Sequence, residues 1–187
     1  MKRSAIFLDR DGTINELVDP RNVTNKLLIL PMAAEAIREL NKMGFVVIVI
    51  TNQAAIARGL LTEHILHEIH ESLRLELLRS RAVIDAFYHC PHHPTEAIVS
   101  KYNLVCSCRK PATGLIQNAV EDFDINVERS FLIGDMTTDI AAGRAMGIKT
   151  ILVETGFAGK DKLVTALSDY TSKHLMDAVS IIRQSIK

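Results

Sequence analysis

Short apolar runs alternate with amphipathic segments along this chain, and that alternation constrains the fold more than any other feature. Residues 45–50 are six consecutive apolar residues rich in Val and Ile, which is typical of a strand buried on both faces. Strands that alternate with helices predict an α/β fold with a mainly parallel sheet covered on both faces. We expect strands at residues 5–8, 45–50, 83–88, 130–133 and 150–153, and helices at residues 31–43, 62–77, 113–123 and 139–146 and from Thr171 or Ser172 to Ile186.

The length and charge of the chain predict a single domain without a membrane span. The 187 residues carry 22 basic and 22 acidic side chains, and no Pro- or Gly-rich linker divides them, so we expect one domain over residues 1–187. No apolar run approaches the roughly 18 residues of a membrane span, and the N-terminal residues do not resemble a secretory leader. Zero net charge argues against a general nucleic-acid binder. We therefore expect a cytoplasmic monomer that binds neither nucleic acid nor membranes.

Three of the predicted strands end in polar residues suited to chemistry. Residues 9–13 follow the first strand, residues 51–53 follow the second, and residues 134–139 follow the fourth. In open parallel sheets, ligands bind beyond the carboxyl ends of the strands. These three ends would gather carboxylates, a hydroxyl and an amide in one crevice, which makes this edge of the sheet the candidate site.

The carboxylates in this crevice predict phosphoryl-transfer chemistry with Mg²⁺. Asp9, Asp11 and Asp135 would form an electronegative cluster, and Mg²⁺ with several retained waters suits such oxygen ligands. Asp9 can then attack phosphorus as a nucleophile, while Asp11 can protonate the leaving group and later activate water. Lys110 and the Thr51 hydroxyl can stabilise charge on the phosphoryl oxygens. The alternative for each motif alone is that the aspartates merely end a strand or form a turn.

The three cysteines lie in one short stretch, and their odd number argues against a disulfide framework. Cys90 precedes Pro-His-His, and Cys106 and Cys108 follow after a long irregular segment. Three thiolates with one imidazole suit tetrahedral Zn²⁺ in a closed structural site. Such a metal would help to order a long loop, whereas the alternative is three reduced cysteines beside an incidental histidine pair.

Taken in order, the polar residues resemble the four motifs of the haloacid dehalogenase-like phosphatases. These motifs are Asp9-x-Asp11-Gly12-Thr13, Thr51-Asn52-Gln53, Lys110-Pro111 and Gly134-Asp135-x₃-Asp139. The resemblance implies a Rossmann-like three-layer sandwich, Mg²⁺ dependence and an aspartyl-phosphate intermediate. It assigns Asp9 as the nucleophile and Asp11 as the general acid/base. It also implies that Asp9, Asp135 and the Asp11 carbonyl bind magnesium. Asp139 would support the water shell of the metal.

The cysteine segment is similar to the zinc loop of two groups in that family, the heptose bisphosphate phosphatases and the histidinol-phosphate phosphatases. The resemblance implies that the zinc ligands are Cys90, His92, Cys106 and Cys108. His93 is then spare, although it could replace His92. A zinc-stapled loop would bring Arg109 and Lys110 to the phosphate, where Arg109 can contact a second phosphate or a sugar hydroxyl.

The long run between His92 and Cys106, together with residues 51–59, is more similar to the heptose group. This similarity implies a small sugar bisphosphate as substrate, with removal of the 7-phosphate from D-glycero-D-manno-heptose 1,7-bisphosphate. We expect three further residues to contact substrate or lie near it, namely Asn52, Gln53 and Arg58.

Two features depart from the heptose pattern, the segment 19–23 and Met136. Histidinol phosphate or another small sugar phosphate is therefore an alternative substrate. A zinc-stabilised binding protein with an idle site is the non-enzymatic alternative. Residues 62–83 leave room for one helix and no large cap domain, so loops must define the pocket.

Three histidines recur at three-residue spacing on the predicted helix at residues 62–77. We interpret His64, His67 and His70 as a solvated face, because the expected apolar stripe occupies other positions. That stripe consists of Ile65, Leu66, Ile69, Leu73 and Leu77.

Overall fold

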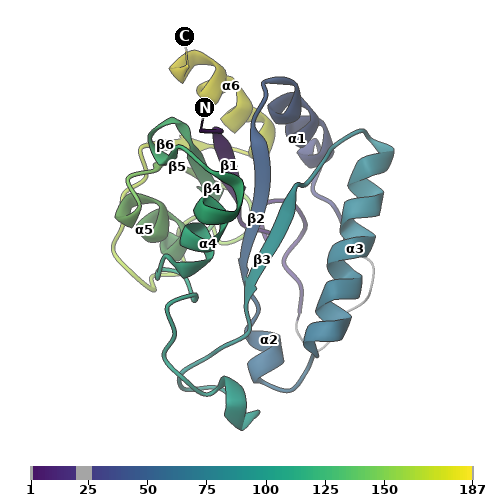
Figure 1. The fold of residues 1–187 in the computed structure, drawn as a ribbon, viewed down its shortest axis with the longest axis vertical. Helices are drawn as coiled ribbons and strands as arrows, with labels where there is room; N and C mark the ends of the chain where they lie inside the picture. The colour runs from purple at the N-terminus through teal and green to yellow at the C-terminus, as the bar shows by residue number, and fades with distance from the viewer. Residues whose placement is uncertain (1, 20–26, 187) are drawn as a thin grey trace.

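The computed structural model describes residues 2–19 and 27–186, which fold around a sheet of six parallel strands (Figure 1). Their order across the sheet is β3-β2-β1-β4-β5-β6, and each neighbouring pair is parallel. This arrangement confirms the predicted α/β fold. The strands are β1 (Ala5–Leu8), β2 (Val46–Asn52), β3 (Ala86–Cys90), β4 (Phe131–Gly134), β5 (Lys149–Val153) and β6 (Tyr170–Ser172).

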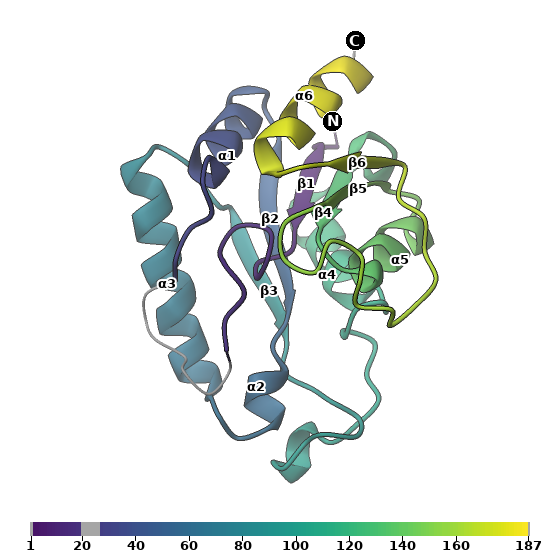
Figure 2. The same cartoon turned by 180° about the vertical axis from the view of Figure 1, so that it is seen from behind.

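Helices cover both faces of the sheet and complete a three-layer sandwich (Figures 1 and 2). On β1, Ile6 and Leu8 face the core under α1 and α6, whereas Ala5 and Phe7 face the core under α4. This alternation follows from the two-residue period of a strand. The helices are α1 (Ala33–Lys42), α2 (Ala54–Ala57), α3 (Glu63–Arg79), α4 (Gly114–Phe123), α5 (Thr137–Ala145) and α6 (Leu175–Ser185), with 3₁₀ turns η1 (Ser100–Tyr102) and η2 (Val127–Arg129).

The short elements differ most from the expectation. Helix α2 has four residues and β6 has three, so neither is long enough to give a periodic signal. Strand β3 begins at Ala86, because the preceding Val83 is exposed and bonds to the Asn41 side chain instead of joining the sheet. Helix α6 begins at Leu175, since Thr171 and Ser172 belong to β6.

Helix α3 corrects our interpretation of the three histidines. Leu66, Ile69 and other apolar residues are buried as expected, but Ile65 is 37% exposed. His70 is 5% exposed and is therefore not part of a solvated face, unlike His64 and His67. The helix turns His70 toward the loop after β1, a contact that spacing within the helix does not reveal.

The carboxyl ends of β2 and β3 point to the lower end of the molecule in Figure 1, whereas the twist of the sheet turns β5 and β6 across the view. The segment between β3 and α4 extends at that lower end as a long loop beside α2. Within the described ranges, no helix is both long and apolar enough to span a bilayer.

Candidate active site

The turn after β1 carries Asp9 and Asp11. Asp9 follows the last residue of β1, and its backbone N–H donates to the carbonyl of Ile133 in β4 at 3.0 Å. Gly12 has a φ of 83°, and a Cβ at this position would lie 2.4 Å from Oδ2 of Asp135. A glycine is therefore needed here for the β1 turn to lie against the Asp135 carboxylate.

The turn after β4 carries Asp135 and Asp139. Gly134 ends the strand, and a Cβ there would lie 2.4 Å from Oδ2 of Asp139. That oxygen accepts a hydrogen bond from the backbone N–H of Met136 at 3.0 Å. Met136 is the N-cap residue of α5, so this contact stabilises the start of the helix. Oδ2 of Asp135 accepts the N–H of Phe157 at 2.7 Å, whereas its Oδ1 is buried without a hydrogen-bond partner. The Gly-Asp-x₃-Asp spacing thus places two carboxylates at one strand end.

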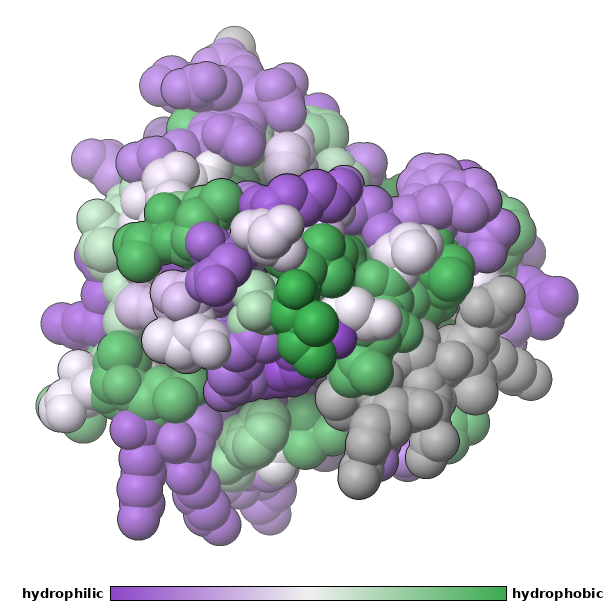
Figure 3. Space-filling model, turned by 90° about the horizontal axis from the view of Figure 1, so that it is seen from below, coloured by the Kyte–Doolittle hydropathy of each residue, from purple (hydrophilic) through white to green (hydrophobic). Residues whose placement is uncertain are grey.

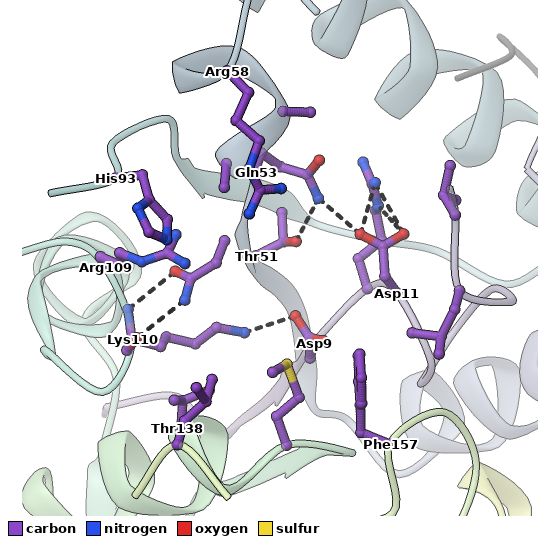
Figure 4. Close-up of a pocket in the computed structure, with 18 of the residues that line it drawn as sticks. Asp9, Asp11, Thr51, Gln53, Arg58, His93, Arg109, Lys110, Thr138 and Phe157 are labelled. Atoms are coloured by element: carbon purple, nitrogen blue, oxygen red, sulfur yellow. Dashed lines mark hydrogen bonds and ion pairs between the residues drawn. The ribbon is translucent and has the colours of Figure 1, made fainter. Parts of the chain in front are cut away.

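Lys110 links the two turns, and Figure 4 shows its contact with Asp9. Its Nζ lies 2.7 Å from Oδ1 of Asp9 and 2.7 Å from Oδ1 of Asp139, and it donates to the Ile50 carbonyl at 2.7 Å. The Asn52 amide bonds to both the N–H and the carbonyl of Lys110, at 3.0 and 3.1 Å. Asn52, which we expect to contact substrate, lines the pocket and also holds the lysine loop in place.

The charges at this site perturb one another strongly. Burial raises the pKa of Asp9 to about 7, although the Lys110 ammonium opposes that rise. Burial and the Asp9 carboxylate raise the pKa of Asp135 to about 8. For Lys110, burial disfavours the charge, but Asp139 and Asp9 outweigh it and raise the pKa. Three buried carboxyl groups thus share one ammonium, and burial disfavours the ionised form of Asp9 and Asp135 when no further cation is present.

A divalent cation fits this imbalance. Asp9, Asp135 and Asp139 each offer a carboxylate oxygen, and these atoms lie within 4.8 Å of one another. The unpartnered Oδ1 of Asp135 is a buried hard donor, which is what Mg²⁺ prefers. Asp139 uses its oxygens on Lys110 and on the start of α5, so Asp9 and Asp135 are better suited as ligands.

Asp11 and Thr51 are held by a second group of polar contacts. The Asp11 carboxylate accepts hydrogen bonds from Arg10, from the Asn15 amide at 2.9 Å and from the Gln53 amide at 2.8 Å. The Gln53 amide also donates to the Thr51 hydroxyl at 2.9 Å. Gln53, an expected substrate residue, therefore connects the predicted acid/base to the predicted phosphate-binding hydroxyl (Figure 4).

A pocket of about 500 Å³ opens over these residues. Arg58, His93 and Arg109 bring basic groups to it from one side (Figure 4), with Arg58 paired to Glu96. Arg109 also donates to the His92 carbonyl at 3.2 Å. Figure 3 shows apolar side chains beside polar ones on this face. The apolar part of the lining includes Leu17, Val18, Leu27, Met136, Phe157, Leu163 and Val164.

The long loop brings the three cysteines and His92 together. The three Sγ–Sγ distances are 3.1, 3.3 and 3.5 Å. Nδ1 of His92 lies 3.3 Å from Sγ of Cys108 and 3.7 Å from Sγ of Cys90. A tetrahedral zinc with Zn–S bonds of about 2.3 Å needs sulfur separations of about 3.8 Å, so a small expansion accommodates the ion. The ring of His93 accepts backbone N–H groups and lines the pocket, so His92 is the histidine that fits the zinc cluster.

Sequence reasoning missed four residues that shape the site. Arg10 and His70 support Asp11, and Asn15 bonds to it directly. Phe157 donates its N–H to Asp135 from a loop that we did not consider. In the sequence, the glycine that precedes Phe157 could have indicated a close approach of the backbone. In the structure Gly156 has a φ of 58° and passes close to the Asp135 carboxylate.

Known proteins match the chain over nearly its whole length. A HAD-hydrolase-like family model matches residues 107–180. The D-glycero-beta-D-manno-heptose-1,7-bisphosphate 7-phosphatase of Escherichia coli K12 is 35% identical over 184 residues, which is 98% of this chain and 93% of that protein. The enzyme of the same name from Rhodopseudomonas palustris is 39% identical over 147 residues, covering 79% of this chain and 81% of that protein.

A solved structure agrees with these relatives. The D,D-heptose 1,7-bisphosphate phosphatase from B. bronchiseptica, complexed with magnesium and phosphate, matches with a TM-score of 0.84 and 28% identity. The match covers 97% of this chain and 99% of that one. The order of motifs, the sheet and the full-length similarity agree, and the chain therefore belongs to the haloacid dehalogenase-like phosphatases, a family of phosphoric monoester hydrolases.

Proposed function

We propose that this protein is a Mg²⁺-dependent phosphatase that removes the 7-phosphate of D-glycero-D-manno-heptose 1,7-bisphosphate. The observation that carries the proposal is the convergence of Asp9, Asp11, Lys110 and Asp135 at one edge of the sheet. The names of the full-length relatives support the substrate and favour its β anomer. An idle binding protein has no use for a buried carboxylate oxygen without a partner, so the geometry favours an enzyme.

In the first step Asp9 attacks phosphorus. A bond forms between an Asp9 carboxylate oxygen and phosphorus, while the bond between phosphorus and the sugar oxygen breaks. Asp11 gives a proton to that sugar oxygen, so the sugar leaves as an alcohol. Lys110 holds Asp9 in place at 2.7 Å and, with the Thr51 hydroxyl, lies where it can stabilise phosphoryl oxygens.

In the second step water attacks the phosphorus of the aspartyl phosphate. Asp11 takes a proton from that water, the bond between phosphorus and the Asp9 oxygen breaks, and inorganic phosphate leaves. Asp9, Asp135 and the Asp11 carbonyl would hold Mg²⁺, which supplies positive charge against the phosphoryl oxygens. Asp139 keeps Lys110 charged and oriented.

The basic side of the pocket is suited to the second phosphate. Arg109 can bind it through a bidentate contact, and Arg58 and His93 lie on the same side. Met136, one of the two departures from the heptose pattern, brings an apolar group to the pocket lining. The other departure from the heptose pattern is the segment 19–23, and its residues 20–23 lie outside the residues that the structure describes.

We also propose that zinc holds the loop that delivers Arg109 and Lys110. The four ligands would be Cys90, His92, Cys106 and Cys108. This set leaves no position for substrate, so the role of zinc is structural.

A phosphate-release screen over heptose, hexose, pentose and histidinol phosphates tests the proposed activity. We expect Mg²⁺-dependent release with a preference for heptose 1,7-bisphosphate, and none from the Asp9→Asn variant. A clear preference for histidinol phosphate would replace the substrate but keep the reaction. No release from any of these compounds would refute the phosphatase.

A further inference from the structure

We propose that His70 is a positioning residue for the acid/base chemistry, acting through Arg10 on Asp11. The inference rests on the proposed function, because it assigns His70 a role in that reaction. His70 lies on α3, outside the family motifs, and we had interpreted it as solvated.

A continuous chain of contacts connects the helix to the reacting groups. Nη1 of Arg10 lies 3.0 Å from Nε2 of His70, and both side chains are buried. The same guanidinium donates to Oδ1 of Asp11 at 3.2 Å through Nε, and to both carboxylate oxygens through Nη2 at 3.0 and 2.9 Å. Gln53 continues the chain from Asp11 to Thr51. Asn15 and Gln53 each contact one oxygen of Asp11, whereas Arg10 contacts both, so the position of Asp11 depends in part on where Arg10 is held.

The direction of the first hydrogen bond follows from chemistry. A guanidinium can only donate, so Nε2 of His70 must accept, and the ring must be neutral with its proton on Nδ1. Burial and the Arg10 charge, with a contribution from His89 and His67, lower the pKa of His70 to about 2. The neutral form that the contact requires is therefore the one that this environment favours.

The His70 ring is itself fixed on its other side. It stacks on Phe87 of β3, with ring centroids 4.6 Å apart and an interplanar angle of 17°. His89 lies edge-on at 6.2 Å. His70 therefore presents a rigid acceptor to Arg10, whose long side chain would otherwise sample several rotamers. A loose Arg10 would let Asp11 move away from the leaving group, and small displacements of a catalytic group reduce the rate strongly.

Two substitutions of His70 separate the hydrogen bond from packing. His70→Phe can still stack on Phe87 but cannot accept from Arg10, whereas His70→Gln places an amide oxygen near the position of Nε2. His67→Ala, at an exposed site on the same helix, is the matched control. Circular dichroism and thermal melting verify that each variant is folded. An Arg10→Met variant and the double variant with His70→Phe test the chain from its other end.

The measurement compares a sugar phosphate with p-nitrophenyl phosphate, whose leaving group needs no proton. We expect His70→Phe to lower kcat/KM for the sugar phosphate by about 10-fold or more and that for p-nitrophenyl phosphate by less than about threefold. His70→Gln should recover most of the loss, and His67→Ala should resemble the wild type. Arg10→Met should reproduce the loss without adding to it in the double variant.

The outcomes separate this inference from the function on which it rests. Equal losses on both substrates, no loss, or no recovery by His70→Gln would overturn the positioning role and leave the phosphatase intact. A wild-type protein that hydrolyses neither substrate with Mg²⁺ would overturn the proposed function, and with it any role of His70 in that reaction.

Discussion

The carboxylate cluster and the cysteine cluster both bring metal-ligating side chains together, but the chain builds them differently. Asp9 and Asp135 each directly follow one of two adjacent strands, and the Asp9 N–H bonds across the sheet to Ile133. Cys106 and Cys108 lie in the loop between β3 and α4, where Val105 is 87% exposed and η1 is the regular structure described. One cluster is positioned by the sheet, whereas in the other the sheet positions only Cys90, the last residue of β3.

This difference teaches how each cluster relates to stability. The sheet forces buried carboxylates together, and Lys110 offsets only part of their repulsion, so the carboxylate cluster costs stability and serves chemistry. The loop packs Ala97, Val99 and Tyr102 against the core beside α2 and α3, and a metal that joins Cys106 and Cys108 to Cys90 and His92 would add to the order of the loop. We therefore expect substitution of a metal ligand to lower stability in the cysteine cluster and to raise it in the carboxylate cluster when Mg²⁺ is absent.

The largest expected effect is on the rate of Asp9→Asn. The amide cannot act as a nucleophile, so kcat should fall by more than about 10⁴-fold. The substitution preserves shape and an acceptor for Lys110, so the fold should persist. Phosphate release measures the rate, and circular dichroism serves as the control for folding. Residual activity above one tenth of the wild type would contradict Asp9 as the nucleophile.

Loss of zinc should have the largest effect on stability. We expect about one zinc per chain by elemental analysis. A zinc-selective chelator in excess Mg²⁺, or Cys106→Ser, should lower Tm by at least about 5 °C. The exposed neighbour Ser107 provides the control Ser107→Ala, which should keep both zinc and Tm. Metal-free protein with an unchanged Tm would show that the loop is ordered without zinc.

The sequence predicts Asp9 and Asp135 of the carboxylate cluster because each directly follows a short apolar strand of the parallel sheet, whereas the third clustered carboxylate is Asp139 and not Asp11. The cysteine cluster is equally predictable, since its residue types are rare and suit one chemistry. His70 could not be predicted: its spacing matches that of exposed His67, and its burial results from contact with Arg10, 60 residues away. Strand β6 was missed because three residues carry no periodic signal and its pairing with β5 is tertiary.

The support for Asp11 from α3 adds a pH dependence to the sheet-built site. The folded pKa of His70, about 2, lies below the usual value of 6.5, so the unfolded chain binds a proton that the folded chain does not. The contribution of His70 to stability should therefore be constant well above pH 6.5 and decrease as the pH falls below it, by about 2 kcal/mol from pH 7 to 5.

Urea unfolding of the wild type and of His70→Gln at pH 7 and pH 5 measures this contribution. The variant should lose about 2 kcal/mol less than the wild type over that range. His64→Gln, on the exposed side of α3, should lose as much as the wild type. Parallel losses in all three proteins would mean that His70 titrates normally in the folded state.

The smallest expected effect is a gain in stability in the carboxylate cluster, opposite in sign to the loss expected in the cysteine cluster. Asp135→Asn in Mg²⁺-free buffer at pH 7 should raise stability by about 1 kcal/mol, or about 2–4 °C in Tm, because burial and Asp9 raise the pKa of the Asp135 carboxyl to about 8, so the wild type must take up a proton there on folding and the amide need not. Asp169→Asn is the matched control. Its carboxylate accepts two hydrogen bonds from Thr150 and lies 3.7 Å from Arg144, so removal of the charge should lower stability.

Addition of Mg²⁺ should then make the wild type more stable than Asp135→Asn. The ion stabilises the form that binds it by mass action, and the variant has lost a carboxylate ligand. Differential scanning calorimetry with and without Mg²⁺ tests both halves of this statement. If Asp135→Asn is less stable than the wild type without Mg²⁺, then the sheet does not hold these carboxylates at a cost. The contrast between a site that the fold imposes and a loop that the metal orders would then fail.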